Sequence, residues 1–245
     1  SNLLLEIKPN SISLTASDME VELVVHVEAK LDQTTRLTLP AKKILDICRA
    51  LPEDSTLEFD IQNEKALIKS GKSRFTLATL PAQEYPVIDI TDEAVDFSLS
   101  HEGLTNLLTN TQFAMAQQDV RYYLNGLFLN FSNQEIFGVA TDGHRLAKSG
   151  SEAEENIEEA TSAIVPRKGI IEIEKQIKEE KNSVQISISK NHLQVASDGC
   201  QAITKLIDGK FPDFEKVIPA NLDKLIVVDC KLLKFGQYKK SYKRQ

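Results

Sequence analysis

The chain has 245 residues, of which 41% are hydrophobic and 27% charged, a composition that excludes a wholly disordered protein. Lysine and arginine number 29 against 36 acidic residues, and the net charge of −7 argues against a nucleic-acid partner unless the basic residues gather in one cleft. Three widely spaced cysteines without a CxxC pair fit a reduced compartment, no apolar run approaches the ~18 residues of a membrane span, and the first residues lack a signal-peptide pattern. We therefore expect a cytoplasmic protein with no membrane partner.

The first half of the chain alternates short strand patterns with one helix. The helix begins at Pro40, where proline is tolerated in a first turn, and ends at Pro52. Its apolar positions are Ile44, Leu45, Ile47, Cys48 and Leu51. Strands are predicted at Leu3–Ile7, Ser11–Ala16, Glu20–Val27, Thr56–Ile61, Lys65–Lys69 and Arg74–Leu80.

The second half begins with a strand in which Val95, Phe97 and Leu99 alternate. Ser100 can cap a following helix, whose apolar face is predicted to hold Leu104, Leu107, Leu108 and Met115. A second helix is predicted from Pro166 to about Lys178, and the acidic stretch Gly150–Thr161 is predicted to be a loop. Further strands are predicted near Leu127–Phe131, Ile136–Thr141, Arg145–Ser149, Val184–Ser189, His192–Ala196 and Gln201–Leu206.

The two halves repeat one another. Leu39–Ile47 aligns without gaps on Val165–Ile173, and Tyr85-Pro86 aligns on Phe211-Pro212 at the same offset (212 − 86 = 126). The sequence therefore predicts two copies of one α+β domain, each with antiparallel sheets and two helices on one side. Near the start of the chain the offset is 125 − 2 = 123, and projecting Val95 back by it gives a position before residue 1. We accordingly expect the first strand and helix of the first copy to be missing from this chain.

The sequence offers little for catalysis. Four scattered histidines show no metal-ligand spacing, and no nucleophile elbow, Walker loop or dinucleotide fingerprint is present. We predict no catalytic residue, no metal and no cofactor.

The string Thr141–Leu146 allows two interpretations. Asp142-Gly143 is typical of a tight hairpin turn, and Ser17-Asp18 stands at the equivalent place in the first copy, which favours a structural turn. The His-Arg-Leu that follows combines a basic and an apolar residue, which suits the binding of a peptide.

Two other segments could face phosphates. In Gln117–Tyr123, an arginine beside two tyrosines can pair with a phosphate and stack on bases, although a surface charge beside a packed tyrosine explains it equally well. Each of the two repeated helices starts with a pair of basic residues, Lys42-Lys43 and Arg167-Lys168, at the end where backbone N–H groups favour anions. A charge pair on a solvated helix is the commoner explanation for either one alone.

These segments together resemble the bacterial sliding clamp, the beta subunit of DNA polymerase III. The resemblance runs from residue 2 to about residue 234. It is carried by Pro40–Arg49, Ser73–Pro81, Gln118–Gly126, Ala140–Ala147, Val165–Gly169 and Phe211–Asp213.

The resemblance implies a non-enzymatic processivity factor for DNA replication, a component of the DNA polymerase III holoenzyme, which is a nucleotidyltransferase complex. Clamp protomers join head to tail as a homodimer ring around double-stranded DNA, with sheets outside and two helices per domain lining the hole. The expected partners are DNA, the polymerase III alpha subunit, the clamp loader and other proteins with a clamp-binding motif. The implied domains are residues 1–93, 94–226 and a third-domain remnant at 227–245.

The resemblance also assigns residues by position. DNA-binding positions are Lys42, Arg49, Gln118, Arg121, Tyr122, Tyr123, Arg167 and Lys168. The groove for the clamp-binding peptide takes Leu124, Thr141, Gly143, His144, Arg145, Leu146, Pro212, Lys216 and Val217. Phe75 and Leu77 are assigned to the dimer interface.

The chain departs from the family in several places. Val227–Lys234 resembles the opening of a third domain, but the run Phe235–Gln245 abandons any helical apolar pattern, so we expect a truncated or frame-shifted product. Lys42 and Lys216 stand where relatives often carry arginine, which keeps the charge but weakens bidentate contacts. The alternative function is therefore an interaction module that binds clamp-binding peptides without closing a ring.

Overall fold

The computed structural model describes residues 2–29, 34–62, 64–90, 93–132, 135–151, 157, 160–177, 182–219 and 223–234. They fall into two compact units, residues 1–211 and 212–245. The division lies between Phe211 and Pro212, the two residues that the repeat aligns on Tyr85-Pro86. The domain boundaries expected at residues 93 and 226 stay predictions.

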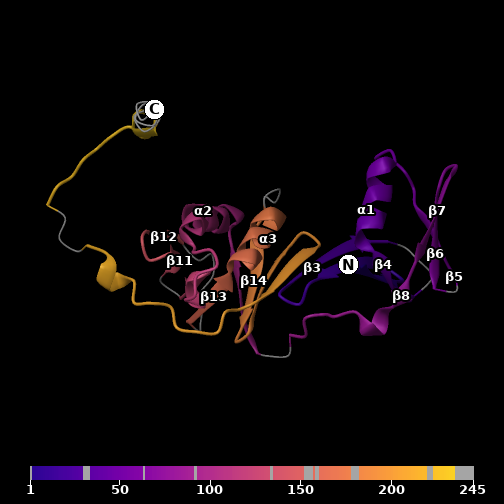
Figure 1. Ribbon diagram of the computed structural model, residues 1–245, viewed down its shortest axis with the longest axis horizontal. Coiled ribbons are helices and arrows are strands. Elements are labelled where there is room, and N and C mark those ends of the chain that lie inside the picture. Colours follow the sequence, from indigo (N-terminus) through magenta and orange to yellow (C-terminus); the bar gives the residue numbers. More distant parts are fainter. Residues whose placement is uncertain are drawn as a thin grey trace. The chain divides into compact units, whose positions relative to one another are not determined.

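The first unit contains both copies of the repeat (Figure 1). The strands of the first copy are β1 (Asn2–Lys8), β2 (Ser11–Ser17), β3 (Val21–Glu28), β4 (Thr35–Pro40), β5 (Glu58–Gln62), β6 (Lys65–Ser70), β7 (Ser73–Ala78) and β8 (Leu80–Pro81). Those of the second copy are β9 (Ala94–Leu99), β10 (Gly126–Phe131), β11 (Ile136–Thr141), β12 (Leu146–Ser151), β13 (Thr161–Pro166), β14 (Val184–Ser189), β15 (His192–Ser197) and β16 (Cys200–Lys205).

Three α-helices accompany these strands in the described part of the first unit. They are α1 (Ala41–Ala50), α2 (His101–Thr111) and α3 (Arg167–Ile177), with short 3-10 turns η1 (Ala82–Glu84), η2 (Gln112–Ala114), η3 (Tyr122–Leu124) and η4 (Glu215–Val217). Figure 1 shows α1, α2 and α3 toward the same side of the first unit. In the described residues the second copy has the two expected helices, whereas the first copy has α1 alone.

The copies are joined through their sheets. A nine-stranded antiparallel sheet runs β8-β4-β1-β2-β3-β16-β15-β14-β9, so β3 of the first copy pairs with β16 of the second, with Leu23 opposite Ala202. Two smaller sheets have the orders β12-β11-β10-β13 and β5-β6-β7. The predicted α+β class with antiparallel sheets is confirmed.

Strand pairing confirms the repeat. Leu3 of β1 lies opposite Leu39 of β4, and Leu127 of β10 lies opposite Val165 of β13. By the same correspondence β12 is the second-copy equivalent of β3, and β7 is the first-copy equivalent of β16. Asn2, opposite Pro40, occupies the place of Gly126, opposite Pro166. The offset expected near the start of the chain was 123, and the pairing corrects it to 126 − 2 = 124.

Four expectations need correction. Strands β4 and β13 were missed because each runs directly into a helix through a proline. The stretch Arg74–Leu80 is two strands, because the chain changes partner at buried Thr79: β7 pairs with β6, whereas β8 pairs with β4. Gly150 belongs to β12 and Thr161 starts β13, so the predicted acidic loop is shorter.

The fourth correction concerns α2. Ser100 caps it as predicted, accepting the Gly103 N–H at 3.1 Å, but the helix ends at Thr111 and buried Met115 lies beyond η2. Lys178, the predicted end of the other helix, lies outside the described residues.

Candidate DNA and peptide interface

The turn between β11 and β12 is held by its own side chains. The Asp142 carboxylate accepts the backbone N–H groups of His144 (2.9 Å) and Arg145 (3.1 Å), which lower the pKa of that carboxyl below its usual value. The Thr141 hydroxyl oxygen accepts the Gly143 N–H (3.0 Å), and Gly143 has a φ of +86°. The predicted hairpin turn is therefore present, and it leaves Gly143, His144 and Arg145 exposed.

The turn between β2 and β3 repeats this arrangement. Asp18 accepts the backbone N–H groups of Glu20 (3.1 Å) and Val21 (3.0 Å), and Ser17 accepts that of Met19 (3.3 Å). Met19 occupies the position of Gly143 and has a φ of +73°. Two turns with the same bonds at equivalent places confirm that the copies share their local structure.

The first-copy turn is bound to the second copy. The Lys168 ammonium, in the first turn of α3, forms ion pairs with Asp18 and with Glu20, the latter at 3.1 Å. The Lys168 hydrogen bond lowers the pKa of the Asp18 carboxyl. Sequence reasoning missed this contact because its partners lie far apart in the chain.

Arg121 lies behind the second-copy turn. Its guanidinium makes two bonds to the Asp119 carboxylate, Nε to Oδ1 at 3.0 Å and Nη2 to Oδ2 at 2.9 Å. Those bonds lower the pKa of Asp119 to about 2. Asn125 exchanges two hydrogen bonds with the Asp119 backbone, both at 2.9 Å, which fixes the loop to the start of β10.

The other residues predicted to face DNA differ in their surroundings. Lys42 and Arg49 are exposed at the two ends of α1. Arg167 is half-buried and donates to the carbonyls of Gln112 and Met115 (3.5 Å each), at the end of α2. Lys168 is exposed but paired as described.

The remaining DNA positions lie in the loop before β10. Gln118 is exposed and has a φ of +56°. The rings of Tyr122 and Tyr123 meet edge to face at 5.8 Å between centroids, and Tyr122 is exposed. Such rings are available for stacking.

The residues predicted for the peptide groove are divided between the two units, and each set is described by itself. In the first unit, Leu124 is buried and Leu146 half-buried beside the turn. The Arg145 guanidinium bonds Asp142 (3.0 Å) and lies 5.7 Å from the ring of Phe113, an exposed aromatic that sequence reasoning missed.

In the second unit, Pro212 and Val217 are exposed, and Lys216 is paired with Asp213 at 2.8 Å. Asp229 starts a helical turn over residues 230–234 by accepting the N–H groups of Lys231 (2.9 Å) and Leu232 (3.0 Å).

The predicted dimer residues lie on β7, at the edge of the β5-β6-β7 sheet. Leu77 is buried in the first-copy core and Phe75 packs against that core half-exposed. Arg74, Thr76 and Ala78, which alternate with them along β7, are exposed.

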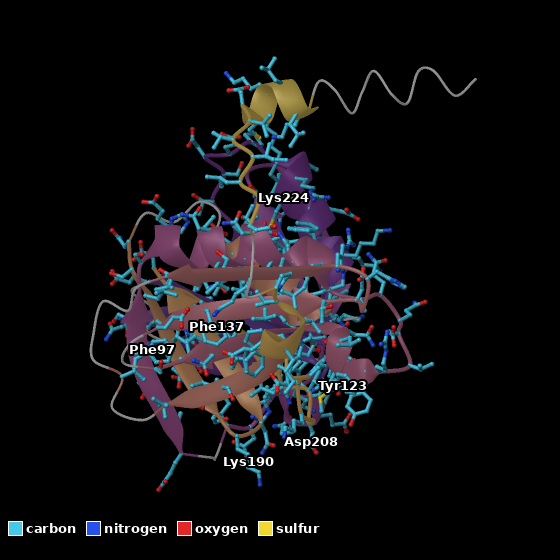
Figure 2. The ribbon with its side chains drawn as sticks, turned by 90° about the vertical axis from the view of Figure 1, so that its left-hand side faces the viewer. Phe97, Tyr123, Phe137, Lys190, Asp208 and Lys224 are labelled. Carbon is cyan, nitrogen blue, oxygen red and sulfur yellow. The ribbon has the colours of Figure 1, made fainter. Side chains whose placement is uncertain are left out.

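A cavity of about 650 Å³ lies elsewhere in the first unit. It contains none of the predicted site residues and is lined by Phe128, Ser162–Ile164, Lys190, Asn191 and Leu206–Phe211. Figure 2 shows two of these, Lys190 and Asp208, at the same lower end of the ribbon. Among the described residues no three histidine, cysteine or acidic side chains form a metal-binding group, and no helix is long and apolar enough to cross a membrane.

Comparison with known proteins agrees with this architecture. The family model for the DNA polymerase III beta subunit, N-terminal domain, matches residues 1–89, and that for its central domain matches residues 98–213. The beta sliding clamp of Pseudomonas aeruginosa is 41% identical over 235 residues, 96% of this chain and 64% of that protein. The beta sliding clamp of Escherichia coli K12 is 40% identical over 234 residues, 95% of this chain and 64% of that protein.

Solved structures show the same likeness. A crystal structure of the DNA polymerase sliding clamp from P. aeruginosa superposes with a TM-score of 0.92 at 40% identity, covering 99% of this chain and 66% of that one. A P. aeruginosa clamp bound to griselimycin gives 0.94 at 40% identity and the same coverage. Caulobacter crescentus pol III beta gives 0.85 at 32% identity, covering 90% of this chain and 62% of that one.

Two copies of an α+β domain joined edge to edge, with these structural neighbours, define a DNA clamp. The chain belongs to the DNA polymerase III beta subunit family, the bacterial beta sliding clamps. It spans 64% of the length of the curated relatives compared here.

Proposed function

We propose that this chain acts as a sliding clamp, a processivity factor that encircles duplex DNA and tethers the replicative polymerase during replication. The observation that carries the proposal is the pairing of β3 with β16, which joins two copies of one domain into one sheet. Its membership of the beta sliding clamp family supports the same function.

The joint between the copies can be repeated. β12, the equivalent of β3, is an edge strand at one end of the repeat, and β7, the equivalent of β16, is an edge strand at the other. A head-to-tail contact that uses different edges on its two sides makes a ring when its rotation closes. This supports self-association in which β7, with Phe75 and Leu77, meets another domain.

Helix ends provide the inner surface of such a ring. Lys42 in the first turn of α1 and Arg49 near its end are exposed, and Lys168 in the first turn of α3 is exposed but paired with Asp18 and Glu20. Contacts of this kind attract phosphates without reading sequence, which suits a protein that slides. The bases lie on helices despite a net charge of −7 for the whole chain.

The exposed turn Thr141–Leu146 supports a second activity of the same protein, the binding of clamp-binding peptides from the polymerase III alpha subunit and the clamp loader. The P. aeruginosa relative has been crystallised with griselimycin, and that compound is a usable probe for this chain. Replication places the protein in the cytoplasm and requires no bond chemistry from it.

Retention on DNA tests the proposal. The protein is assembled on a nicked circular plasmid bound to beads, washed at moderate salt, and the plasmid is then cut once. A closed clamp remains on the circle and leaves when an end is created, so retention falls at least several-fold. Equal retention before and after cutting would overturn the encircling function. Griselimycin binding without any retention would instead favour the interaction module.

A further inference from the structure

Gly143 lies against the Arg121 guanidinium. A Cβ added at Gly143 would be 3.1 Å from Nη2 and 3.2 Å from Nη1 of Arg121. Contacts this short require the neighbour to move. A Cβ at residue 143 would therefore force the Arg121 guanidinium to shift by a few tenths of an ångström.

Backbone conformation alone does not demand this glycine. Met19 occupies the equivalent position of the first-copy turn, with a φ of +73° against +86° for Gly143 and the same pattern of backbone hydrogen bonds. Its side chain is accommodated there and is 44% exposed. What distinguishes the second-copy turn is the arginine behind it.

Arg121 is fixed on both sides. The Asp119 carboxylate accepts the two guanidinium bonds and a third hydrogen bond from the backbone N–H of Arg121 (2.8 Å). Asn125 in turn fixes Asp119 to the start of β10. On the other side Nη2 donates to the Asp142 carbonyl at 3.4 Å. The planar fork of arginine can span loop and turn at once, which a lysine cannot do.

We infer that Arg121 is a positioning residue of the peptide groove: its guanidinium, seated against Gly143, sets the Thr141–Leu146 turn that receives the peptide. This inference rests on the proposed function. It predicts that Arg121 is not a DNA-phosphate ligand, because its guanidinium is already paired with the Asp119 carboxylate. The bound partner is a peptide segment lying over Gly143 and Leu146.

A double-mutant cycle with griselimycin as the probe tests the inference. Gly143→Ala is expected to weaken binding about 10-fold and Arg121→Ala about 3- to 10-fold, while the double variant binds within about 2-fold of Arg121→Ala, since neighbours that share one contact are not additive. Arg121→Lys should not rescue binding. Met19→Ala, in the equivalent turn, is the control and should leave the affinity unchanged.

DNA binding separates the two roles. Arg121→Ala should leave the salt dependence of DNA affinity unchanged, whereas a lost phosphate contact lowers the logarithmic slope by about 0.9. Additive losses in the cycle, or a slope lowered by about one contact, would overturn the inference.

Amide exchange distinguishes failure of the inference from failure of the proposed function. Exchange at His144 and Arg145 is measured without DNA or griselimycin. The positioning role predicts that exchange is faster in Gly143→Ala than in the unmodified chain, and that adding Arg121→Ala to that variant does not increase it further. This result would support the role even if the unmodified chain binds no griselimycin. Unchanged exchange in Arg121→Ala would contradict it.

Discussion

The two copies share a fold but bury their equivalent helices to different depths. α3 buries Gly169, Ile170, Ile173 and Ile177, whereas α1 buries only Ile47. The repeat aligns Ile44 with Ile170, yet Ile44 is only partly buried and Ile170 is fully buried. α2 packs beside α3, and no helix occupies that place beside α1 in the described part of the first copy.

Gly169 sharpens the contrast. A Cβ there would lie 2.4 Å from the hydroxyl oxygen of buried Thr204, so α3 sits directly on β16. The aligned residue of α1 is Lys43, which is exposed. Similar helical sequences can thus have different burial, because burial depends on what packs against them.

The largest expected effect is at Ile170. Ile170→Ala should lower the free energy of unfolding of the second domain by about 2–5 kcal/mol, since it leaves a cavity in a closed core. Ile44→Ala is the matched change in the first domain and should cost roughly 1 kcal/mol, because that site already meets solvent. Chemical denaturation measures both, and equal losses would contradict the difference in packing.

The next effect is at Gly169. Gly169→Ala should destabilise the second domain by about 1–3 kcal/mol through overpacking against Thr204, despite the better helix propensity of alanine. Lys43→Ala, at the aligned position, should change stability by no more than about 0.5 kcal/mol. A stabilising Gly169→Ala, read by the same denaturation experiment, would mean that α3 does not touch β16.

A smaller effect is expected at Lys168, which joins the copies. Lys168→Ala should lower the free energy of unfolding by about 0–1 kcal/mol, because the ion pairs with Asp18 and Glu20 are half-exposed, and the loss should shrink at high salt.

DNA titrations compare the same lysine with its counterpart in α1. Lys42→Ala should lower the logarithmic salt slope of DNA affinity by about 0.9, the value for one phosphate, and Lys168→Ala should lower it by less than half of that. If the two lysines lower the slope equally, the carboxylates do not neutralise Lys168.

The smallest effect concerns Glu22, which stands where the second copy has Leu146. It is buried in β3 and accepts the Ile88 N–H at 2.9 Å, and burial raises the pKa of its carboxyl above the ordinary 4.5. Because the folded state binds this proton more tightly, the contribution of Glu22 is most favourable at low pH and is lost as pH rises through the raised pKa. The free energy of unfolding of Glu22→Gln, measured relative to that of the unmodified chain, should therefore be more favourable at pH 7.5 than at pH 4.5. Denaturation at both values checks this, and an unchanged pH dependence would contradict it.

Local features of this molecule could be predicted from the sequence, and features that depend on distant contacts could not. Ser100 and the Asp142-Gly143 turn were predicted because their hydrogen bonds lie within three residues. β4 and β13 were missed because no residue separates either strand from the helix that follows it. The partners of Lys168 lie about 150 residues away and exist only after the copies pair, so no motif could have shown them.

The central claim is that both copies turn their helices toward duplex DNA. Photo-crosslinking residues placed singly at Lys42 of α1 and at Lys168 of α3 test it most directly. The control is Gln185 of β14, which is exposed because its side chain points to the other face of the sheet from its buried neighbour Ile186. The account predicts crosslinks to DNA from both helices and none from the strand. Crosslinks from only one copy, or from Gln185 as strongly as from the helices, would contradict it.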